Sequence, residues 1–224
     1  MPNKEQLYIS LTESCRTSGA QLVVVSKMRS IEEILELYTL GQRLFAENRV
    51  QELLHKVPLL PGDIEWHLIG HLQTNKVRTV LPYIQCLQSL DSLKLAIKVQ
   101  EEAQKLNTRM RCLLQIKIAA EETKYGWDFE ALLSLFQSGQ HLAWSHIQLA
   151  GVMGMATLTS DQDQVRSEMR QLKNHFDQLK SMFFSASPEF RTISMGMSGD
   201  YPIALEEGST MIRVGSLLFP NPPA

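Results

Sequence analysis

The sequence predicts an α/β fold, a TIM-like (β/α)8 barrel formed by one domain of 224 residues. Short apolar runs alternate with segments of helical periodicity, and eight such runs can be counted along the chain. Regular alternation of this kind implies parallel strands joined by right-handed crossovers. An open doubly wound sheet is the alternative. It lacks its best support, because no GxGxxG motif follows the first strand.

Each predicted strand is a short run of apolar residues that are either β-branched or placed at alternating positions. The first, Gln21–Ser26, contains three consecutive valines and is expected to be buried on both faces. The others are expected, in order, at Leu44–Ala46, Glu65–Ile69, Ile84–Ser89, Arg109–Ala119, within Ala143–Met153, and at Arg191–Met195 and Thr210–Val214.

The predicted helices show amphipathic spacing, and most of them end at a glycine or a proline. Gly41, Pro58, Pro82, Gly139 and Gly208 supply these stops. Helices are expected at Glu5–Thr17, Ile31–Leu40, Glu47–Val57, Gln73–Leu81, Asp91–Leu106, Asp128–Gln137, Ser160–Phe184 and Tyr201–Glu207. The expected organisation is therefore a leading helix within residues 1–20, the barrel over 21–219 and a tail over 220–224.

Composition argues against several classes of protein. The 22 basic and 24 acidic residues nearly balance, which is unlike a protein that grips nucleic-acid backbone. No apolar run reaches the length of a membrane span, and the first residues lack the apolar core of a signal peptide, so a cytoplasmic protein is expected. Cys15, Cys86 and Cys112 form no CxxC or metal-binding pattern and are expected to be buried, reduced thiols, with no metal site.

The loops after the seventh and eighth predicted strands carry the pattern of a phosphate site. They read SMGMSGD (194–200) and RVGS (213–216), and small residues let backbone N–H groups approach an anion. Barrels often bind phosphate at these two loops. Tight βα turns that need glycine for their geometry are the alternative, and both interpretations remain open. Met195 and the neighbouring methionines are expected to pack flexibly around a ligand at the mouth.

Lys27 stands where the first predicted strand emerges at the mouth of the barrel, directly after a buried run. Desolvation at an apolar rim disfavours the ammonium form of a lysine, and a neutral amine can attack an aldehyde to form a Schiff base. The alternative is a strand-end lysine that simply reaches water. A phosphate site across the mouth favours the first interpretation, because pyridoxal 5′-phosphate carries an aldehyde at one end and a phosphate at the other.

Three further residues are candidates for contacts with such a cofactor. Asn48 could hydrogen-bond the ring hydroxyl or the imine, or it could cap the following helix. His67, on the third strand, could line the pocket or be a satisfied core histidine. Arg213 could meet the pyridine nitrogen, where a positive neighbour weakens the cofactor as an electron sink, or it could pair with Glu206 or Glu207.

The chain resembles the pyridoxal-phosphate homeostasis proteins, single-domain relatives of the barrel domain of bacterial alanine racemases. The matching segments are VVVSK (23–27), FAENRVQE (45–52), WHLIGHLQTNK (66–76), QSLDS (88–92), EETKYG (121–126), GVMGM (151–155) and SMGMSGDYPIALEEGSTMIRVGS (194–216). The resemblance covers about residues 22–219 and implies a (β/α)8-like barrel preceded by a helix.

The resemblance also implies a role for several residues. Lys27 would hold the cofactor as an internal aldimine, Arg213 would contact the pyridine nitrogen, and Gly215 with Ser216 would bind the phosphate. Ser198 from the preceding loop would join them. Asn48, His67, Ser194 and Met195 complete the expected cofactor-binding set.

The sequence departs from the usual family pattern at three places. SKTKP in the family is SKMRS (26–30) here, which leaves Lys27 intact and keeps a cation at Arg29. Lys117 replaces a usual asparagine, which puts polar contacts near the fifth strand in doubt. The chain ends in FPNPPA (219–224) where many relatives read FG followed by charged residues.

Three functions are compatible with these residues. The favoured one is a non-catalytic pyridoxal-phosphate-binding protein of vitamin B6 homeostasis that influences amino-acid and keto-acid pools and has apoenzymes as candidate partners. An alanine-racemase-like enzyme of low activity is the main alternative. Against this alternative, no second domain is expected here of the kind that supplies a tyrosine base in racemases. Since that domain also supplies racemase dimer contacts, a monomer is expected. A Schiff-base aldolase, which would hold no pyridoxal phosphate, is the third.

Overall fold

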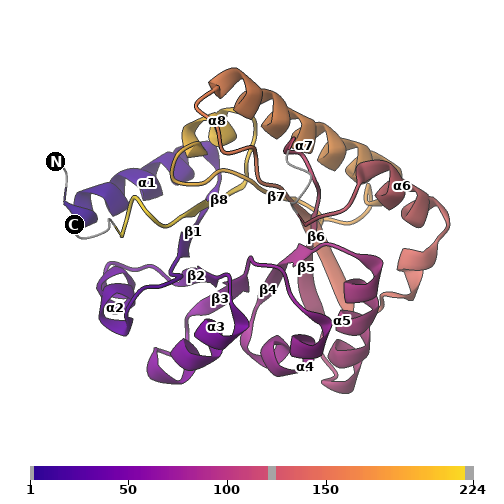
Figure 1. The fold of residues 1–224 in the computed structure, drawn as a ribbon, viewed down its shortest axis with the longest axis horizontal. Helices are drawn as coiled ribbons and strands as arrows, with labels where there is room; N and C mark the ends of the chain where they lie inside the picture. The colour runs from indigo at the N-terminus through magenta and orange to yellow at the C-terminus, as the bar shows by residue number, and fades with distance from the viewer. Residues whose placement is uncertain (1–2, 121–124, 220–224) are drawn as a thin grey trace.

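The computed structural model describes residues 3–120 and 125–219, and it confirms the predicted barrel. Eight parallel strands close on one another in sequence order, with β1 hydrogen-bonded to both β2 and β8 (Figure 1). The strands are β1 (Gln21–Val25), β2 (Leu44–Glu47), β3 (Glu65–Leu68), β4 (Cys86–Leu90), β5 (Met110–Gln115), β6 (Ile147–Met153), β7 (Thr192–Ser194) and β8 (Met211–Val214). The predicted tail at 220–224 and part of the EETKYG segment, 121–124, lie outside the described residues.

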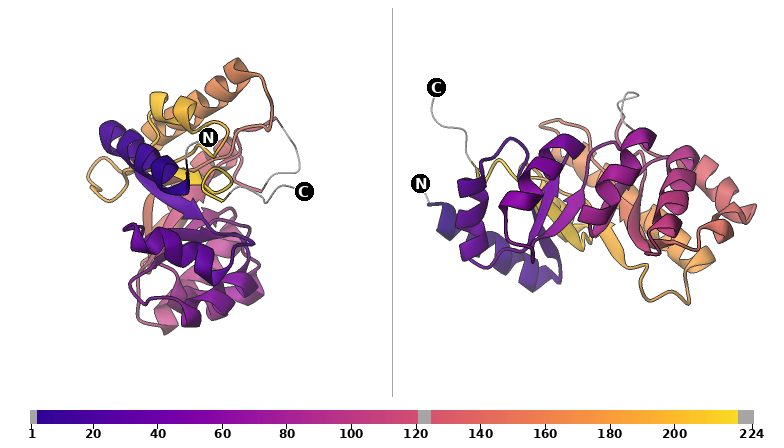
Figure 2. Two further views of the ribbon diagram at one scale, coloured as in Figure 1. Left: turned by 90° about the vertical axis from the view of Figure 1, so that its left-hand side faces the viewer. Right: turned by 90° about the horizontal axis from the view of Figure 1, so that it is seen from below.

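Helices surround the barrel on its outside (Figures 1 and 2). They are α1 (Lys4–Ser18), α2 (Ile31–Thr39), α3 (Val50–Lys56), α4 (Val77–Val80), α5 (Leu93–Lys105), α6 (Phe129–Gln137), α7 (Gln162–Phe183) and α8 (Tyr201–Glu206). The leading helix α1 lies in the ring between α2 and α8, beside β1 and β8 (Figure 1). It buries Tyr8, Leu11 and Cys15 there, so it covers the edge of the ring where the first and last strands meet.

Some predicted elements are shorter or more broken in the structure. The segment expected as one helix at Gln73–Leu81 consists of a 3-10 turn, the short α4 and a second 3-10 turn that contains Pro82. The fifth strand ends at Gln115 rather than Ala119, and beyond it only Ile116 pairs, in an isolated bridge with Trp127. The sixth strand lies within Ala143–Met153 as predicted, and it begins at Ile147, after the 3-10 helix Gln140–Ala143.

The main hydrophobic core lies between the strands and the surrounding helices. Alternate residues of each strand face outward into it, such as Leu22 and Val24 of β1 and Ile212 and Val214 of β8. The intervening positions face the barrel interior, and the small separate cluster of Val23, Ala46 and Met211 belongs to this set. The interior also holds buried polar side chains, namely His67, Gln88, Ser194 and Arg213.

Two expectations drawn from composition can be compared with the fold. All three cysteines are buried and free, as expected. Within residues 3–120 and 125–219, no helix combines the length and the apolar character that a membrane crossing requires.

Candidate functional site

A cavity of about 490 Å³ opens at the carboxyl end of the barrel. It is lined by Val25, Lys27, Asn48, Ile69, Gly70, His71, Gln115, Tyr125, Met155, Leu158, Met197, Ser198, Gly199, Arg213, Gly215 and Ser216. Six of the nine residues predicted to bind the cofactor are in this set, and they come from strand ends and loops that are distant in sequence. The volume falls in the range typical of small-molecule sites.

Lys27 extends from the end of β1 into this mouth and is exposed, whereas the five residues before it are buried. The burial that the sequence argument assumed for its side chain is therefore absent. The backbone on either side of Lys27 is held firmly. The Ser26 carbonyl accepts a hydrogen bond from Lys56 Nζ at 2.7 Å, and the Met28 N–H donates to the Glu52 carboxylate.

A buried ionic cluster beneath Lys27 supplies these contacts. Lys56 Nζ lies 2.7 Å from both Glu47 Oε1 and Glu52 Oε1, and the Ser26 hydroxyl donates to Glu47 at 2.7 Å. Burial raises the pKa of Glu47, against the opposing effect of its partners Lys56 and Ser26. The cluster fixes the loop that carries Lys27. The sequence reasoning did not select these residues, although the i,i+4 spacing of Glu52 and Lys56 was a signal.

Arg213 is buried on β8 and points into the barrel. Its guanidinium donates to Ser194 Oγ at 2.6 Å and to the Gly154 carbonyl at 2.9 Å, and burial lowers its pKa to about 10. The alternative of an ion pair with Glu206 or Glu207 is wrong. Those carboxylates pair with Arg166 and Arg170 on α7, because the alternation of β8 turns Arg213 away from α8 and into the barrel.

The loops after β7 and β8 are joined by Ser198. Its hydroxyl oxygen accepts from the backbone N–H of Gly215 at 3.2 Å and of Leu217 at 3.4 Å. A Cβ at Gly215 would lie 2.9 Å from the Val25 carbonyl oxygen, so only glycine lets this turn approach the end of β1. The result is a turn of small residues at the cavity wall, on the strand next to that of Lys27.

Three of the predicted site residues do not line the cavity. His67, Ser194 and Met195 are all buried, with exposed fractions of 1% or less. Ser194 Oγ accepts from Arg213 and donates to Gln88 Oε1 at 2.7 Å, and Gln88 Nε2 donates to His67 Nδ1 at 2.8 Å. Burial and the nearby Arg111 lower the pKa of His67 to about 3, so its imidazole is neutral. Met195 packs in the hydrophobic core.

Asn48 does line the cavity, at the end of β2. The alternative in which it caps the following helix is not what the structure has. The residue that precedes the first turn of α3 is Arg49, and it makes no side-chain capping bond.

The cavity also contains residues that the sequence reasoning did not select. His71 Nδ1 lies 2.6 Å from Asp91 Oδ2, and its ring stacks on Tyr125 with centroids 3.8 Å apart. Gln115 donates to the Tyr125 carbonyl at 2.8 Å, while its Oε1 is buried without a hydrogen-bond partner among residues 3–120 and 125–219. His71 follows the predicted third strand after Gly70, and this position was the one available signal. Gln115 is the last residue of β5, and Tyr125 comes from the segment that follows that strand.

Comparisons with known proteins agree with this geometry. The family profile described as "Alanine racemase, N-terminal domain" matches residues 9–222. A pyridoxal phosphate homeostasis protein of Aquifex aeolicus is 36% identical over 215 residues, which cover 93% of this chain and 92% of that protein. PipY of Synechococcus elongatus, solved without PLP, superposes with a TM-score of 0.87 at 34% identity, over 96% of this chain and 99% of that one.

A second structure of PipY, solved with PLP bound, superposes with a TM-score of 0.81 at 33% identity. It covers 96% of this chain and all of its own (100%). The fold and the mouth with its strand-end lysine define a barrel of the alanine racemase N-terminal type. The chain belongs to the pyridoxal phosphate homeostasis protein family.

Proposed function

We propose that this protein binds pyridoxal 5′-phosphate at the carboxyl end of the barrel and acts in vitamin B6 homeostasis without catalysing a reaction. The observation that carries the proposal is one cavity that contains the exposed amine of Lys27 together with the Ser198–Gly215–Ser216 turn and Arg213. The PLP-bound structure of the related PipY supports it.

The residues present fit this cofactor. When bound, pyridoxal phosphate supplies an aldehyde for a primary amine and a phosphate dianion for hydrogen-bond donors. Lys27 offers the amine, and Ser198, Ser216 and the backbone of Gly215 offer a small-residue cradle that a Cβ would crowd. The Oε1 of Gln115 is buried and has no hydrogen-bond partner in the described part of the chain, so a ligand in the cavity can donate a hydrogen bond to it.

Arg213 explains why binding need not lead to turnover. Its guanidinium is buried, fixed by two hydrogen bonds and positively charged, since its pKa stays near 10. Placed against the pyridine nitrogen, it disfavours protonation of that nitrogen and weakens the ring as an electron sink. Asn48, which lines the same cavity after β2, then orients the ring by hydrogen bonding.

In this proposal the other three predicted residues, Ser194, His67 and Met195, support the residues that line the cavity. Ser194 holds the Arg213 guanidinium, and His67 stands behind it through Gln88. Met195 closes the wall by packing. A direct contact of these three side chains with the cofactor stays a prediction.

The cellular part of the proposal follows from the family. Names of the curated relatives refer to homeostasis rather than to a reaction. We assign this protein to the cytoplasm, as a monomer that holds the cofactor, influences amino-acid and keto-acid pools and has apoenzymes as candidate partners. A stable dimer in light-scattering measurements would contradict the monomer.

Borohydride reduction of the protein loaded with pyridoxal phosphate, followed by peptide mass mapping, tests the binding proposal. A phosphopyridoxyl group on Lys27 is expected, and Lys27→Ala should remove both the adduct and the visible absorbance. Lys117→Ala is the matched control, because Lys117 is exposed near the same end of the barrel without lining this cavity. An adduct at another residue, or no adduct, overturns the proposal.

One observation favours a second function, a low racemase-like activity towards amino acids. His71, held by Asp91 at 2.6 Å, lines the same cavity as Lys27 and supplies a second group able to carry a proton. The test is exchange of the α-proton of L-alanine for deuterium, followed by NMR in the loaded protein. Exchange that His71→Gln abolishes supports this activity, and absence of exchange in the unsubstituted protein excludes it.

A further inference from the structure

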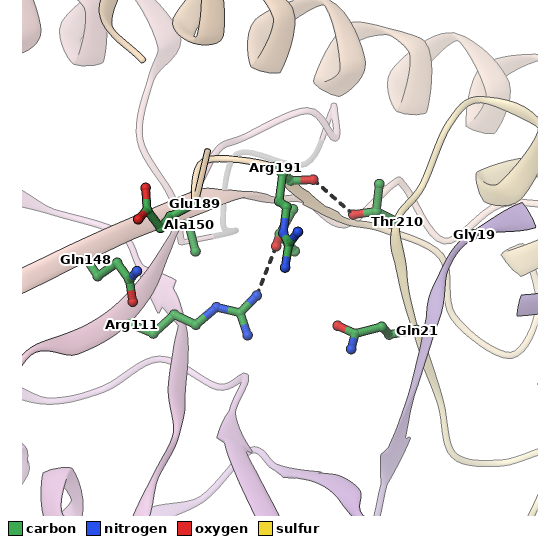
Figure 3. Close-up of a pocket in the computed structure, with 9 residues that line it drawn as sticks. Gly19, Gln21, Arg111, Gln148, Ala150, Glu189, Arg191 and Thr210 are labelled. Atoms are coloured by element: carbon green, nitrogen blue, oxygen red, sulfur yellow. Dashed lines mark hydrogen bonds between the residues drawn. The ribbon is translucent and has the colours of Figure 1, made fainter. Parts of the chain in front are cut away.

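A second cavity, of about 430 Å³, lies at the opposite, amino end of the barrel (Figure 3). Its lining residues stand at or beside the first residues of strands β1, β5, β6, β7 and β8. They are Gly19, Gln21, Arg111, Gln148, Ala150, Glu189, Arg191, Thr192 and Thr210. None of them lines the carboxyl-end cavity, so the two cavities are separate.

Two arginine side chains extend into this amino-end cavity. Figure 3 shows Arg111 of β5 and Arg191, which directly precedes β7, reaching towards the same space, with Gln21 opposite. Arg111 Nη2 donates one hydrogen bond, to Thr192 Oγ1 at 3.1 Å. Among the described residues neither guanidinium forms an ion pair, and the one carboxylate in the lining, Glu189, is exposed and joined to neither.

The positive charges of Arg111 and Arg191 have no negatively charged partner among the described residues. Two like charges share one concave surface, and most of their ten N–H donors lack a protein acceptor among residues 3–120 and 125–219. Elsewhere on the protein, arginines beside carboxylates form ion pairs, as Arg166 and Arg170 do with Glu207. An anion with two or more oxygens matches the planar donor fork of a guanidinium.

We propose that the amino-end cavity binds a small oxyanion, a phosphate or carboxylate group carried by a metabolite, between Arg111 and Arg191. The Gln21 and Gln148 amides line the same wall and can add neutral hydrogen bonds. The rest of the ligand occupies the open part of the cavity. This site goes beyond the proposed function, and neither depends on the other.

The site lies close to the polar chain that leads towards the other end of the barrel. Besides burial, the charge of Arg111 lowers the pKa of His67. His67 is hydrogen-bonded to Gln88, Gln88 to Ser194, and Ser194 to Arg213, which lines the carboxyl-end cavity. An oxyanion bound to Arg111 would offset part of the positive charge that acts on His67. Binding at the amino end is therefore able to change the electrostatics of the buried chain without moving a strand.

Isothermal titration calorimetry of the full chain tests the proposal, with inorganic phosphate and succinate as probes at constant ionic strength set by chloride. Arg191→Gln and Arg111→Gln are each expected to weaken binding of the preferred probe about tenfold or more, as expected for loss of a charge-assisted hydrogen bond. Arg191 is exposed, so its variant keeps the test informative if Arg111→Gln fails to fold.

Two control variants locate the binding. Arg109→Gln removes an exposed cation two residues from Arg111 that does not line this cavity, and Ser198→Ala alters only the carboxyl-end cavity. Arg109→Gln should bind both probes as the unsubstituted protein does. A loss of phosphate binding in Ser198→Ala assigns that part of the binding to the carboxyl-end cavity. Tighter binding of phosphate at the amino end indicates a phosphorylated ligand, and tighter binding of succinate a dicarboxylate. Absence of binding by both probes, or absence of any binding component that the two arginine substitutions weaken, overturns the proposal.

Discussion

At the carboxyl end of the barrel, each of two buried cations has several hydrogen-bond or ion-pair partners. At the amino end, two arginine side chains have almost no such partners among the described residues. Lys56 has three oxygen partners at 2.7 Å, and Arg213 has two fixed acceptors. Arg111 has one hydroxyl, and Arg191 is exposed. The difference follows from where each cation lies. Burial requires partners, while a charge at a strand start can remain hydrated.

This contrast separates the cations that build the site from those that remain available to a ligand. The buried pair shapes the loop of Lys27 and the wall of the cavity, so its loss should reduce stability. Arg191, the exposed member of the amino-end pair, forms no ion pair among the described residues, so its loss should affect binding with little change in stability. Five expected outcomes, ordered from the largest effect to the smallest, test this separation.

Replacing Lys56 with methionine should reduce the free energy of unfolding by about 3–5 kcal/mol, because it leaves Glu47 buried without its cation. Urea denaturation measures the effect. Lys105→Met is the control, since Lys105 is exposed and its ion pair with Glu102 should contribute no more than about 1 kcal/mol.

The cost of Lys56→Met should also depend on pH. Burial raises the pKa of Glu47 above its unfolded value, so its contribution to stability is present at low pH and lost as pH rises through the folded pKa. Without Lys56 that pKa rises further. The deficit should therefore be larger at about pH 8 than at about pH 5. An equal deficit at both values would show that Glu47 is not the residue affected.

His67, midway between the two ends, should make the protein sensitive to acid. Burial lowers the pKa of His67 from 6.5 to about 3. As pH falls below 6.5, the unfolded chain therefore binds a proton at this histidine that the folded protein does not bind. Stability is present above pH 6.5 and lost progressively below it. Between about pH 7 and pH 5 the unsubstituted protein should lose about 2 kcal/mol more than His67→Gln. Parallel losses in urea denaturation would contradict this assignment.

Ser198→Ala should weaken binding of pyridoxal phosphate by roughly 1 kcal/mol, since the variant loses the hydroxyl that organises the N–H groups of Gly215 and Leu217. Equilibrium dialysis measures the affinity. Ser14→Ala, which removes an exposed hydroxyl on α1, is the control. Unchanged affinity in Ser198→Ala would remove this loop from the cofactor site.

Arg191→Gln should change the free energy of unfolding by less than about 0.5 kcal/mol, because the side chain is exposed and makes no ion pair among the described residues. It should also leave the absorbance of bound pyridoxal phosphate unchanged. Urea denaturation and visible spectroscopy check the two statements. A loss as large as that of Lys56→Met would show that the amino-end arginines are structural, and would erase the contrast between the two ends.

Much of the fold could be read from the sequence because its signals are local. Three valines in succession gave β1, and breakers such as Gly41 and Pro58 gave the ends of helices. The segment around Pro82 was harder, since its apolar spacing is helical while the proline allows only short turns there. The predicted end of the fifth strand at Ala119 was wrong, because the loop decides how far pairing extends beyond Gln115.

The candidate site was predicted in part for the same reason. Parallel strands bring their following loops to one end, so position alone placed Lys27, Asn48 and Ser198 at a common cavity. Position could not reveal that Lys56 and Glu47 support Lys27 from below. Nor could it reveal that His71 reaches the cavity while His67, four residues earlier, faces the buried interior.

By itself, therefore, the sequence determined the order of strands and helices, the loops that meet at the mouth and the lysine that stands there. Those features depend on residues near one another in the chain. Only the tertiary structure decided the partners of Arg213, the burial of His67 and the meeting of Arg111 with Arg191. Each of these depends on the register in which distant strands close the barrel, and that register sets which side chains share a layer of the interior.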